Sequence, residues 1–554
     1  LAFSARLQEL NQLYTSQGPQ ALVSHILSQP EIKAQVSTLI RSQDRWEDTQ
    51  GYAVDAAFSD CYKQEVLRRS ARVLRGREVF IFQMEYELSM EFLHAFFEHL
   101  MKVRGCSKQE AMYNTGELAK LLMAGGLGSF KPDLVRGLYD EFNDQWGPFE
   151  AMNRLHVFGV LYAKAIKGQG PIGLVGNVED CDVMEDLLIN RKHPQRALLK
   201  RVAVYKDIDV SRFNIGVNKV NVELYQNPFS PLNEYWLYCP RVFHEAYCGD
   251  SNDDFRAVQS WLYRQVTLRF IKEGVEAGTL NKRLIFSTSE VNTTVVVPRV
   301  IQDEFKDDPA FSNLAVHHYN HTIVPAGMPK YHSYMFGLLR IAEEFECAIE
   351  GDFINLVTIT GMVSDCISGC STMHTQILRD EIFTEFVDKI VEDNLFGNSE
   401  GSYVTRWQAS SIRRVIERYA YMLGVKAAPE SLFAALDANP EQKAQFIDDI
   451  VKVKRGQKAL FIRELFEGTF GDIEFTDEDK ERLADVLLTR PFFTFVRRFV
   501  DYKCGDLIID ILYDQDFRER VIESNAVILI GGRGFGSFAA SQRQRLRDLI
   551  AQDP

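Results

Sequence analysis

Three cationic side chains lie within seven residues late in the sequence: Arg497, Arg498 and Lys503. They come directly after an apolar run with the length of a strand. Guanidinium and ammonium groups this close together can hold a phosphate group through charge-assisted hydrogen bonds. The alternative is an ordinary solvated helix start with surface cations, and the sequence favours neither interpretation.

Two other features could bind a polar ligand. His321 offers one donor and one acceptor nitrogen, which suits a hydroxyl group, although a lone histidine can equally be a satisfied core residue. The turn Gly125-Gly126-Leu127-Gly128 presents backbone N–H groups that few side chains shield, so it could cradle an anion at a helix start. The alternative is a plain tight turn, because glycine readily adopts a positive φ.

Two sets of residues imitate known kinds of site. The loop at 532–536, Gly-Arg-Gly-Phe-Gly, follows an apolar strand as a dinucleotide-binding loop does, but lacks the Gly-x-Gly-x-x-Gly spacing. Cys366, Cys370 and His374 are spaced by four residues, so a helix would place all three on one face, where they could bind zinc. We expect neither site. The glycine spacing of the loop is wrong for a dinucleotide, and two thiols and an imidazole on an apolar helix indicate core packing.

The spacing of apolar residues along the sequence predicts the helices and strands that position these residues. Residues 3–45 and 56–75 predict amphipathic helices, and a further helix is expected at 89–103. Short apolar runs predict strands at 79–82, 202–205, 284–286 and 314–316. Strands that alternate with helices indicate an α/β fold with a largely parallel, doubly wound sheet.

The sequence changes character after residue 370. Residues 371–490 predict almost only helix, and Thr476 with Asp479 forms a capping-box pattern at one helix start. Two strand–helix units follow, with strands at 492–499 and 526–530 and helices at 506–512 and 541–551. Two strands and two helices cannot bury both faces of a sheet, so we expect another protein chain or a second copy of this chain to cover it. The expected domains are 1–370 and 371–554, the second an incomplete Rossmann-like domain with a helical insert.

Composition excludes some classes of function. The 554 residues are 46% apolar and 25% charged, with a formal net charge of −14, which argues against a general nucleic-acid binder. No run approaches the roughly 18 apolar residues of a membrane span. Nine dispersed cysteines are typical of a reducing compartment. We expect a cytoplasmic protein, with an organelle matrix as the alternative because the sequence begins at Leu1.

Seven short segments occur in the order seen in the α-glucan phosphorylases, the family of glycogen and starch phosphorylases. The best match is residues 319–327, Tyr-Asn-His-Thr-Ile-Val-Pro-Ala-Gly, which resembles the family's Thr-Asn-His-Thr-x-x-Pro. The other matching segments are residues 84–86, 125–128, 159–162, 247–250, 367–374 and 496–503. The resemblance implies a GT-B-like fold, with a sugar cleft between two doubly wound domains. It also implies a reaction in which phosphate attacks the terminal α-1,4 glucosidic bond and releases glucose 1-phosphate.

The resemblance also assigns roles to residues. It places Gly126 and Leu127 beside the substrate phosphate, and Glu290 and His321 among the substrate-binding groups. It gives Arg498 and Lys503 to the substrate phosphate. Arg497 would face the phosphate of pyridoxal phosphate, the family's cofactor, which relays a proton during the reaction.

The sequence departs from the family pattern at several of these positions. Asn292 replaces a histidine and Glu400 replaces an asparagine, although both remain candidate substrate-binding residues. Ser368 replaces another asparagine, and Arg533 replaces a lysine. Unmatched buried polar groups cost about 1–3 kcal/mol each, so such exchanges change a site built on amide hydrogen bonds. The family's Schiff-base lysine belongs to a segment beyond residue 554, and the last lysine here is Lys503. We therefore expect no cofactor on this chain.

Three functions remain open. The leading hypothesis is a degenerate phosphorylase-like protein that has lost catalysis and serves as a structural or binding subunit of an assembly. The second is an α-glucan phosphorylase whose cofactor half is on another chain. The third is a module that binds α-glucan without cleaving it.

Overall fold

The computed structural model describes most of the chain from residue 76 onward, with gaps. The described residues are 13, 16–17, 21–22, 24–25, 76–83, 90–102, 105–115, 154–163, 188–189, 197–228, 230, 232–244, 253–324, 327–390, 408–468, 475–497, 499, 503–532 and 536–552. The segments 56–75, 84–86, 125–128 and 247–250 lie outside them. Internal contacts divide the chain into two units, residues 1–403 and 404–554.

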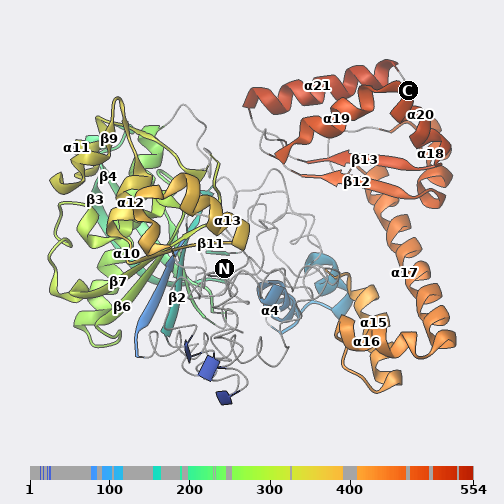
Figure 1. The fold of residues 1–554 in the computed structure, drawn as a ribbon, viewed down its shortest axis with the longest axis horizontal. Helices are drawn as coiled ribbons and strands as arrows, with labels where there is room; N and C mark the ends of the chain where they lie inside the picture. Colours follow the sequence, from blue (N-terminus) through green and yellow to red (C-terminus); the bar gives the residue numbers. More distant parts are fainter. Residues whose placement is uncertain are drawn as a thin grey trace. The chain divides into compact units, whose positions relative to one another are not determined.

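An eight-stranded sheet forms the centre of the first unit (Figure 1), in the order β11-β7-β6-β1-β2-β5-β4-β3. The strands are β1 (Glu78–Phe82), β2 (Leu155–Leu161), β3 (Lys200–Asp209), β4 (Lys219–Gln226), β5 (Asn233–Tyr238), β6 (Arg283–Ser289), β7 (Asn313–Asn320) and β11 (Cys366–Gly369). All neighbouring pairs are parallel except β4 with β5 and β3 with β4. From β1 the chain passes first to β2 on one side and later to β6 on the other, so the predicted doubly wound α/β sheet is confirmed.

The expected strands at 79–82, 284–286 and 314–316 are β1, β6 and β7. The expected strand at 202–205 lies within β3, which is an antiparallel edge strand and not part of the parallel core. A smaller three-stranded sheet has the order β8-β10-β9. Its strands are β8 (Tyr331–His332), β9 (Ile349–Glu350) and β10 (Phe353–Ile354).

Helix α10 (Asp253–Glu276) fills the core of the first unit. Every residue from 257 to 268 is buried, the polar Gln259, Arg264 and Gln265 included, so the helix is enclosed on all sides. It packs with one face of the sheet, which presents Phe80, Phe158 and Phe286. Further helices among the described residues include α4 (Met90–Lys102), α11 (Met335–Leu339), α12 (Leu356–Val363) and α13 (Thr372–Ile377). Helix α4 confirms the one predicted at 89–103.

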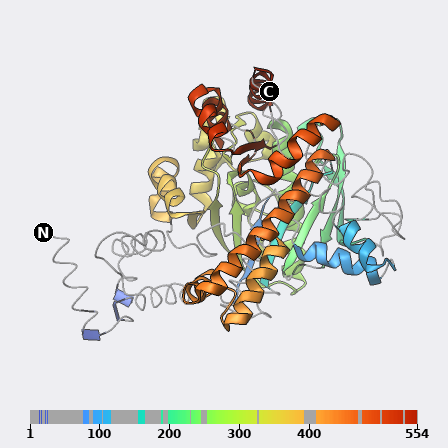
Figure 2. The ribbon, with the colours of Figure 1, turned by 90° about the vertical axis from the view of Figure 1, so that its right-hand side faces the viewer.

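The second unit begins with helices, as the sequence predicts. They are α15 (Ser410–Leu423), α16 (Pro429–Asp437), α17 (Pro440–Phe466) and α18 (Asp477–Thr489). Val415, Tyr419 and Phe446 form a small core where α15 lies beside α17 (Figure 2). The predicted capping box is present at α18: the Asp479 backbone N–H donates to the Thr476 hydroxyl, and the Thr476 backbone N–H donates to the Asp479 carboxylate.

Two parallel strands follow, β12 (Phe492–Val496) and β13 (Val527–Gly531), with helices α19 (Gly505–Tyr513), α20 (Gln515–Glu523) and α21 (Gly536–Gln552). Helices α19 and α21 lie on the same side of the strand pair (Figure 1), where Phe499, Ile509 and Ala539 pack together. The two predicted strand–helix units are therefore confirmed. No helix in the described ranges is both long enough and apolar enough to cross a membrane.

Candidate functional site

The candidate site lies where β6, β7 and β11 end, side by side in the first unit. Glu290 follows β6, His321 follows β7 and Cys370 follows β11. In a doubly wound sheet, ligands bind outside the carboxyl ends of the strands, next to the point where the strand order reverses. That point is the boundary between β1 and β6, so these three residues stand at the expected edge.

Glu290 and His321, two of the residues picked out by the sequence, are brought together. Glu290 Oε1 and His321 Nδ1 are 2.7 Å apart, and their side chains are only 14% and 13% exposed. No well-directed hydrogen bond joins the two atoms, so this is a close polar contact. The other carboxylate oxygen, Oε2, accepts a hydrogen bond from Asn320 Nδ2 at 3.3 Å.

The backbone of Glu290 is strained. Its φ of 65° and ψ of 153° fall in a region that residues other than glycine rarely adopt, at a cost of about 1–3 kcal/mol. Hydrogen bonds hold it there: its N–H donates to the carbonyl of Tyr319 at 3.1 Å, and its own carbonyl accepts from the Thr293 hydroxyl at 3.0 Å. Strain of this kind persists only where the surroundings impose it, which marks Glu290 as a candidate functional residue.

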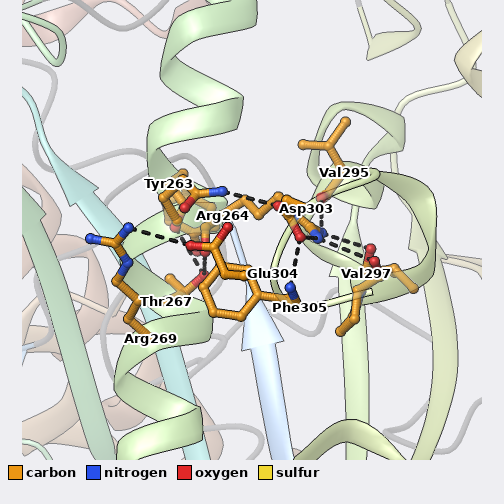
Figure 3. A network of polar contacts seen from close by, with 11 residues as sticks. Tyr263, Arg264, Thr267, Arg269, Val295, Val297, Asp303, Glu304 and Phe305 are labelled. Atoms are coloured by element: carbon orange, nitrogen blue, oxygen red, sulfur yellow. Dashed lines mark hydrogen bonds and ion pairs between the residues drawn. The ribbon is translucent and has the colours of Figure 1, made fainter. Parts of the chain in front are cut away.

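Arg264 of α10 fixes the segment that follows Glu290 (Figure 3). Its guanidinium is fully buried and donates to the carbonyls of Val295 and Val297, both at 2.8 Å. It also forms a bidentate pair with Asp303, with both N–O distances at 2.9 Å. A planar fork of donors is suited to such a set of acceptors. Sequence patterns do not reveal this residue's role, because its partners lie 31 to 39 positions away.

Asn292 lies two residues beyond Glu290, in a 3₁₀ turn (Val291–Val296). Its Oδ1 atom is buried and has no hydrogen-bond donor among the residues that the structure describes. Glu290 Oε1 is in the same condition. An acceptor left unpaired in this way costs about 1–3 kcal/mol, so both oxygens call for a donor from outside the described residues.

The contacts continue through Asn320 to His374 and Cys370, which the sequence offered as zinc-site candidates and as part of the phosphorylase-like segment 367–374. His374 Nε2 lies 3.0 Å from Asn320 Oδ1, and His374 Nδ1 lies 3.2 Å from Cys370 Sγ. The expectation of one helical face was wrong, because Cys366 is in strand β11 and α13 begins only at Thr372. In the described ranges no three His, Cys, Asp or Glu side chains are arranged to hold a metal ion.

Ser368 belongs to the interior of the sheet. Its hydroxyl lies 2.8 Å from His317 Nε2, and the other ring nitrogen of His317 lies 2.9 Å from the Ser287 hydroxyl. The neighbouring His318 lies 3.0 Å from the Thr288 hydroxyl. Complete burial lowers the pKa of both histidines to about 3. They are therefore neutral core residues at physiological pH.

Two of the phosphate-site candidates are described, and both lie in the second unit. Arg497 follows β12 and is exposed, whereas Lys503 is half-buried just before α19. Gly532 has a structural reason to be glycine, because a Cβ atom there would lie 1.7 Å from the Arg497 carbonyl oxygen. Four other candidates lie outside the described residues: Gly126, Leu127, Glu400 and Arg498.

The opposite end of the same sheet contains a pocket of about 400 Å³, which sequence analysis missed. Tyr235 and Phe270 line it, together with His156 and Glu273. His156 Nε2 lies 3.0 Å from Glu78 Oε2, within hydrogen-bonding distance. Burial raises the pKa of Tyr235 to about 12, so this tyrosine is protonated in the pocket wall.

Comparison with known proteins adds one distant likeness. No protein-family model matches the chain, and no curated protein sequence does. Among solved structures, the chain is similar to the catalytic domain of starch synthase IV from Arabidopsis thaliana bound to ADP and acarbose. The sequence identity is 12% and the TM-score 0.48, over 86% of this chain and 72% of that one. The likeness is too distant to assign a function, which must come from the residues themselves.

Proposed function

We propose that the carboxyl end of the first sheet binds a polyhydroxylated ligand of the α-glucan class. The observation that carries this proposal is the pair of buried acceptors, Glu290 Oε1 and Asn292 Oδ1, which lack a donor among the described residues. Sugar hydroxyl groups are hydrogen-bond donors, and they can also accept. A sugar therefore removes the cost of about 1–3 kcal/mol that each unpaired oxygen carries.

The aromatic side chains next to these oxygens support a sugar over other hydroxyl compounds. The rings of Tyr319 and His321 are nearly parallel, at 19°, with their centres 6.2 Å apart. Both are partly exposed at the end of β7. Aromatic surfaces beside polar groups suit ligands that are apolar on one side and rich in hydroxyls at the rim. The resemblance of residues 319–327 to a phosphorylase segment points the same way.

We infer that the protein is a phosphorylase-like, GT-B-type protein that binds glucan without turning it over. The resemblance puts the amide of Asn292 at the position where the phosphorylases have an imidazole, and an amide neither gains nor loses its charge near neutral pH. In this proposal the chain is a structural or binding subunit. Phe493 and Val496 of β12, each 63% exposed, support a covering chain or second copy.

Asn292→Ala tests the proposal most sharply. Removal of an unpaired buried acceptor leaves the free energy of unfolding unchanged or raises it. The same change should weaken maltoheptaose binding about tenfold, as measured by isothermal titration calorimetry, because one hydrogen bond to the ligand is lost. Asn221→Ala is the matched control, since its Oδ1 already accepts from the Asp207 N–H at 2.9 Å.

Two outcomes would contradict this function. If the wild-type protein binds no maltooligosaccharide at millimolar concentration, the carboxyl end is not a glucan site. If the protein releases glucose 1-phosphate from glycogen when inorganic phosphate and pyridoxal phosphate are added, it is an α-glucan phosphorylase and not a binding subunit. The mass of the native particle by light scattering tests the assembly: a monomer alone in solution, with no co-purifying chain, contradicts a subunit role.

A further inference from the structure

Cys370, His374 and Asn320 form a continuous hydrogen-bonded chain. The Cys370 Sγ atom lies 3.2 Å from His374 Nδ1, and His374 Nε2 lies 3.0 Å from Asn320 Oδ1. The side chains become less exposed along the chain, from a half-buried Cys370 through His374 at 8% to Asn320 at 0%. The thiol is thus the outermost of the three groups.

The protonation of the imidazole follows from its partners. Asn320 turns its amide nitrogen toward Glu290 Oε2 at 3.3 Å, so its oxygen faces the ring and requires a hydrogen on Nε2. Burial lowers the pKa of His374, with Glu290 raising it and His321 lowering it to smaller extents. The ring is therefore neutral, and its Nδ1 lone pair faces the thiol. A neutral imidazole in this tautomer can accept the thiol proton.

The backbone places the ring in this position. Gly369 has no side chain, and a Cβ atom there would lie 3.0 Å from His374 Cδ2. Ser371 caps α13, with its hydroxyl accepting from the His374 N–H at 3.1 Å. Gly369 pairs with Asn320 across the strands β11 and β7. Register and cap together bring the three side chains into line.

Other described cysteines have different surroundings. Cys366, four residues earlier in β11, has its pKa raised to about 12 by burial and by Asp365. Cys347 is exposed and lies near the Glu344 carbonyl and the Met362 sulfur. Among the cysteines that the structure describes, Cys370 is the one whose sulfur lies within hydrogen-bonding distance of an imidazole nitrogen. These thiols serve as internal standards for reactivity.

We propose that Cys370 is a nucleophile that accepts an acyl group from an ester or thioester, with His374 as its base and Asn320 as the positioning residue. The sulfur attacks the carbonyl carbon while its proton passes to His374 Nδ1. The bond to the leaving alcohol or thiol then breaks, and that group takes the proton from His374. Water attacks the acyl-cysteine in the same way, which restores the thiol and releases a carboxylic acid. This activity does not depend on the proposed glucan site.

The test uses p-nitrophenyl acetate as the acyl donor and the full chain as the protein. We expect an acetyl group on Cys370, located by peptide mass spectrometry, and a burst of nitrophenolate that Cys370→Ala abolishes. His374→Gln should slow acetylation of Cys370 about 10²-fold, since a general base contributes about 10²–10⁴. Cys366→Ala and Cys347→Ala should leave the burst unchanged.

The pH dependence in the wild-type protein tests the mechanism without any substitution. An exposed thiol such as Cys347 reacts through its thiolate, so its acetylation slows about tenfold per pH unit in acid. Cys370 should slow less steeply, because its proton leaves to a neutral imidazole during attack. In Asn320→Ala the Cys370 profile should revert to the steep one. Equal rates and equal pH profiles for Cys370 and Cys347 would overturn the proposal.

Discussion

The main sheet carries a glutamate–histidine pair at each end of its strands, and the two pairs are built differently. At the amino end, Glu78 and His156 are 3.0 Å apart with 8% and 3% of their side chains exposed. The backbone N–H of Asn281 also donates to Glu78, at 3.2 Å. This pair begins two neighbouring strands and lies in ordinary extended backbone. Both oxygens of its carboxylate are paired, whereas the second ring nitrogen of His156, Nδ1, is buried without a hydrogen-bond partner among the described residues.

The carboxylate at the carboxyl end is less well satisfied than that of Glu78. Glu290 is held at a φ of 65°, and its Oε1 has no aligned donor in the described part of the chain. Asn292, two residues on, has a buried acceptor in the same condition. The amino-end pair therefore contributes to folding, whereas the carboxyl-end pair stores strain and unused hydrogen-bonding capacity. That difference between the two glutamates, and not the residue types, supports the proposal that a ligand binds at the carboxyl end of the sheet.

The two histidines at the centre of the sheet are completely buried. Through them, acid should have the largest effect on the free energy of unfolding. His317 and His318 have pKa values of about 3 in the folded protein, against about 6.5 in the unfolded chain. Between these values the unfolded chain binds more protons, so the free energy of unfolding falls as the pH falls. Well inside this range, each histidine changes the free energy of unfolding by about 1.4 kcal/mol per pH unit. Above about pH 6.5 the slope disappears, and the stabilisation is fully present.

Urea unfolding at pH 7 and pH 5 measures that slope. In His318→Asn, whose amide can still reach the Thr288 hydroxyl, the loss of free energy of unfolding between pH 7 and pH 5 should be about 2 kcal/mol smaller than in the wild type. The imidazole resonances of both histidines should not titrate between pH 5 and 8. A titration near pH 6.5 for either ring would show that these histidines are not buried in the folded protein.

Arg264→Met should be the most damaging single substitution, at about 3–5 kcal/mol. It leaves the Asp303 carboxylate buried without its partner and also releases the carbonyls of Val295 and Val297. Since those carbonyls follow Glu290, maltoheptaose binding should weaken as well. Arg269→Met on the same helix is the control, because its pair with Glu304 is exposed and 3.4 Å long, so its loss should cost under about 1 kcal/mol. Equal costs in urea unfolding would contradict the role of Arg264.

The sequence was sufficient for most of the fold and for little of the site. Apolar runs located β1, β6 and β7, and the capping residues located α18, because these signals are local. The four-residue spacing of Cys366, Cys370 and His374 suggested one helix. Gly369 and the capping Ser371 were the signals for the break between strand and helix that separates them.

Contacts between strands could not be read in this way. Glu290 and His321 could be paired only through their resemblance to a family, since they are 31 positions apart and meet by the register of β6 with β7. The Asn320–His374 contact spans 54 positions and depends on the register of β7 with β11. A buried arginine inside an otherwise mixed helical segment has no local signal at all. The register between strands that are far apart in the chain cannot be predicted from a single sequence.

Replacement by glutamine should reduce stability at Glu78 and ligand binding at Glu290. Glu78→Gln removes the charge from a buried, fully paired carboxylate and should cost about 2 kcal/mol in urea unfolding, with no effect on maltoheptaose. Glu290→Gln should cost about 0.5 kcal/mol or less and weaken maltoheptaose binding about tenfold. If both substitutions reduce stability alike and neither affects binding, the two ends of the sheet do not differ in function.

The smallest effect isolates the strain at Glu290. Glu290→Gly and Glu290→Ala both remove the carboxylate, so both should abolish the contact with His321 and weaken maltoheptaose binding equally. They differ in backbone freedom, because glycine adopts a φ of 65° without strain whereas alanine does not. Glycine also loses more entropy on folding, which reduces its advantage. We therefore expect Glu290→Gly to be more stable than Glu290→Ala by about 1 kcal/mol in urea unfolding. An alanine variant that is as stable as the glycine variant would show that the backbone at Glu290 is relaxed, and the contrast with Glu78 would then rest on hydrogen bonding alone.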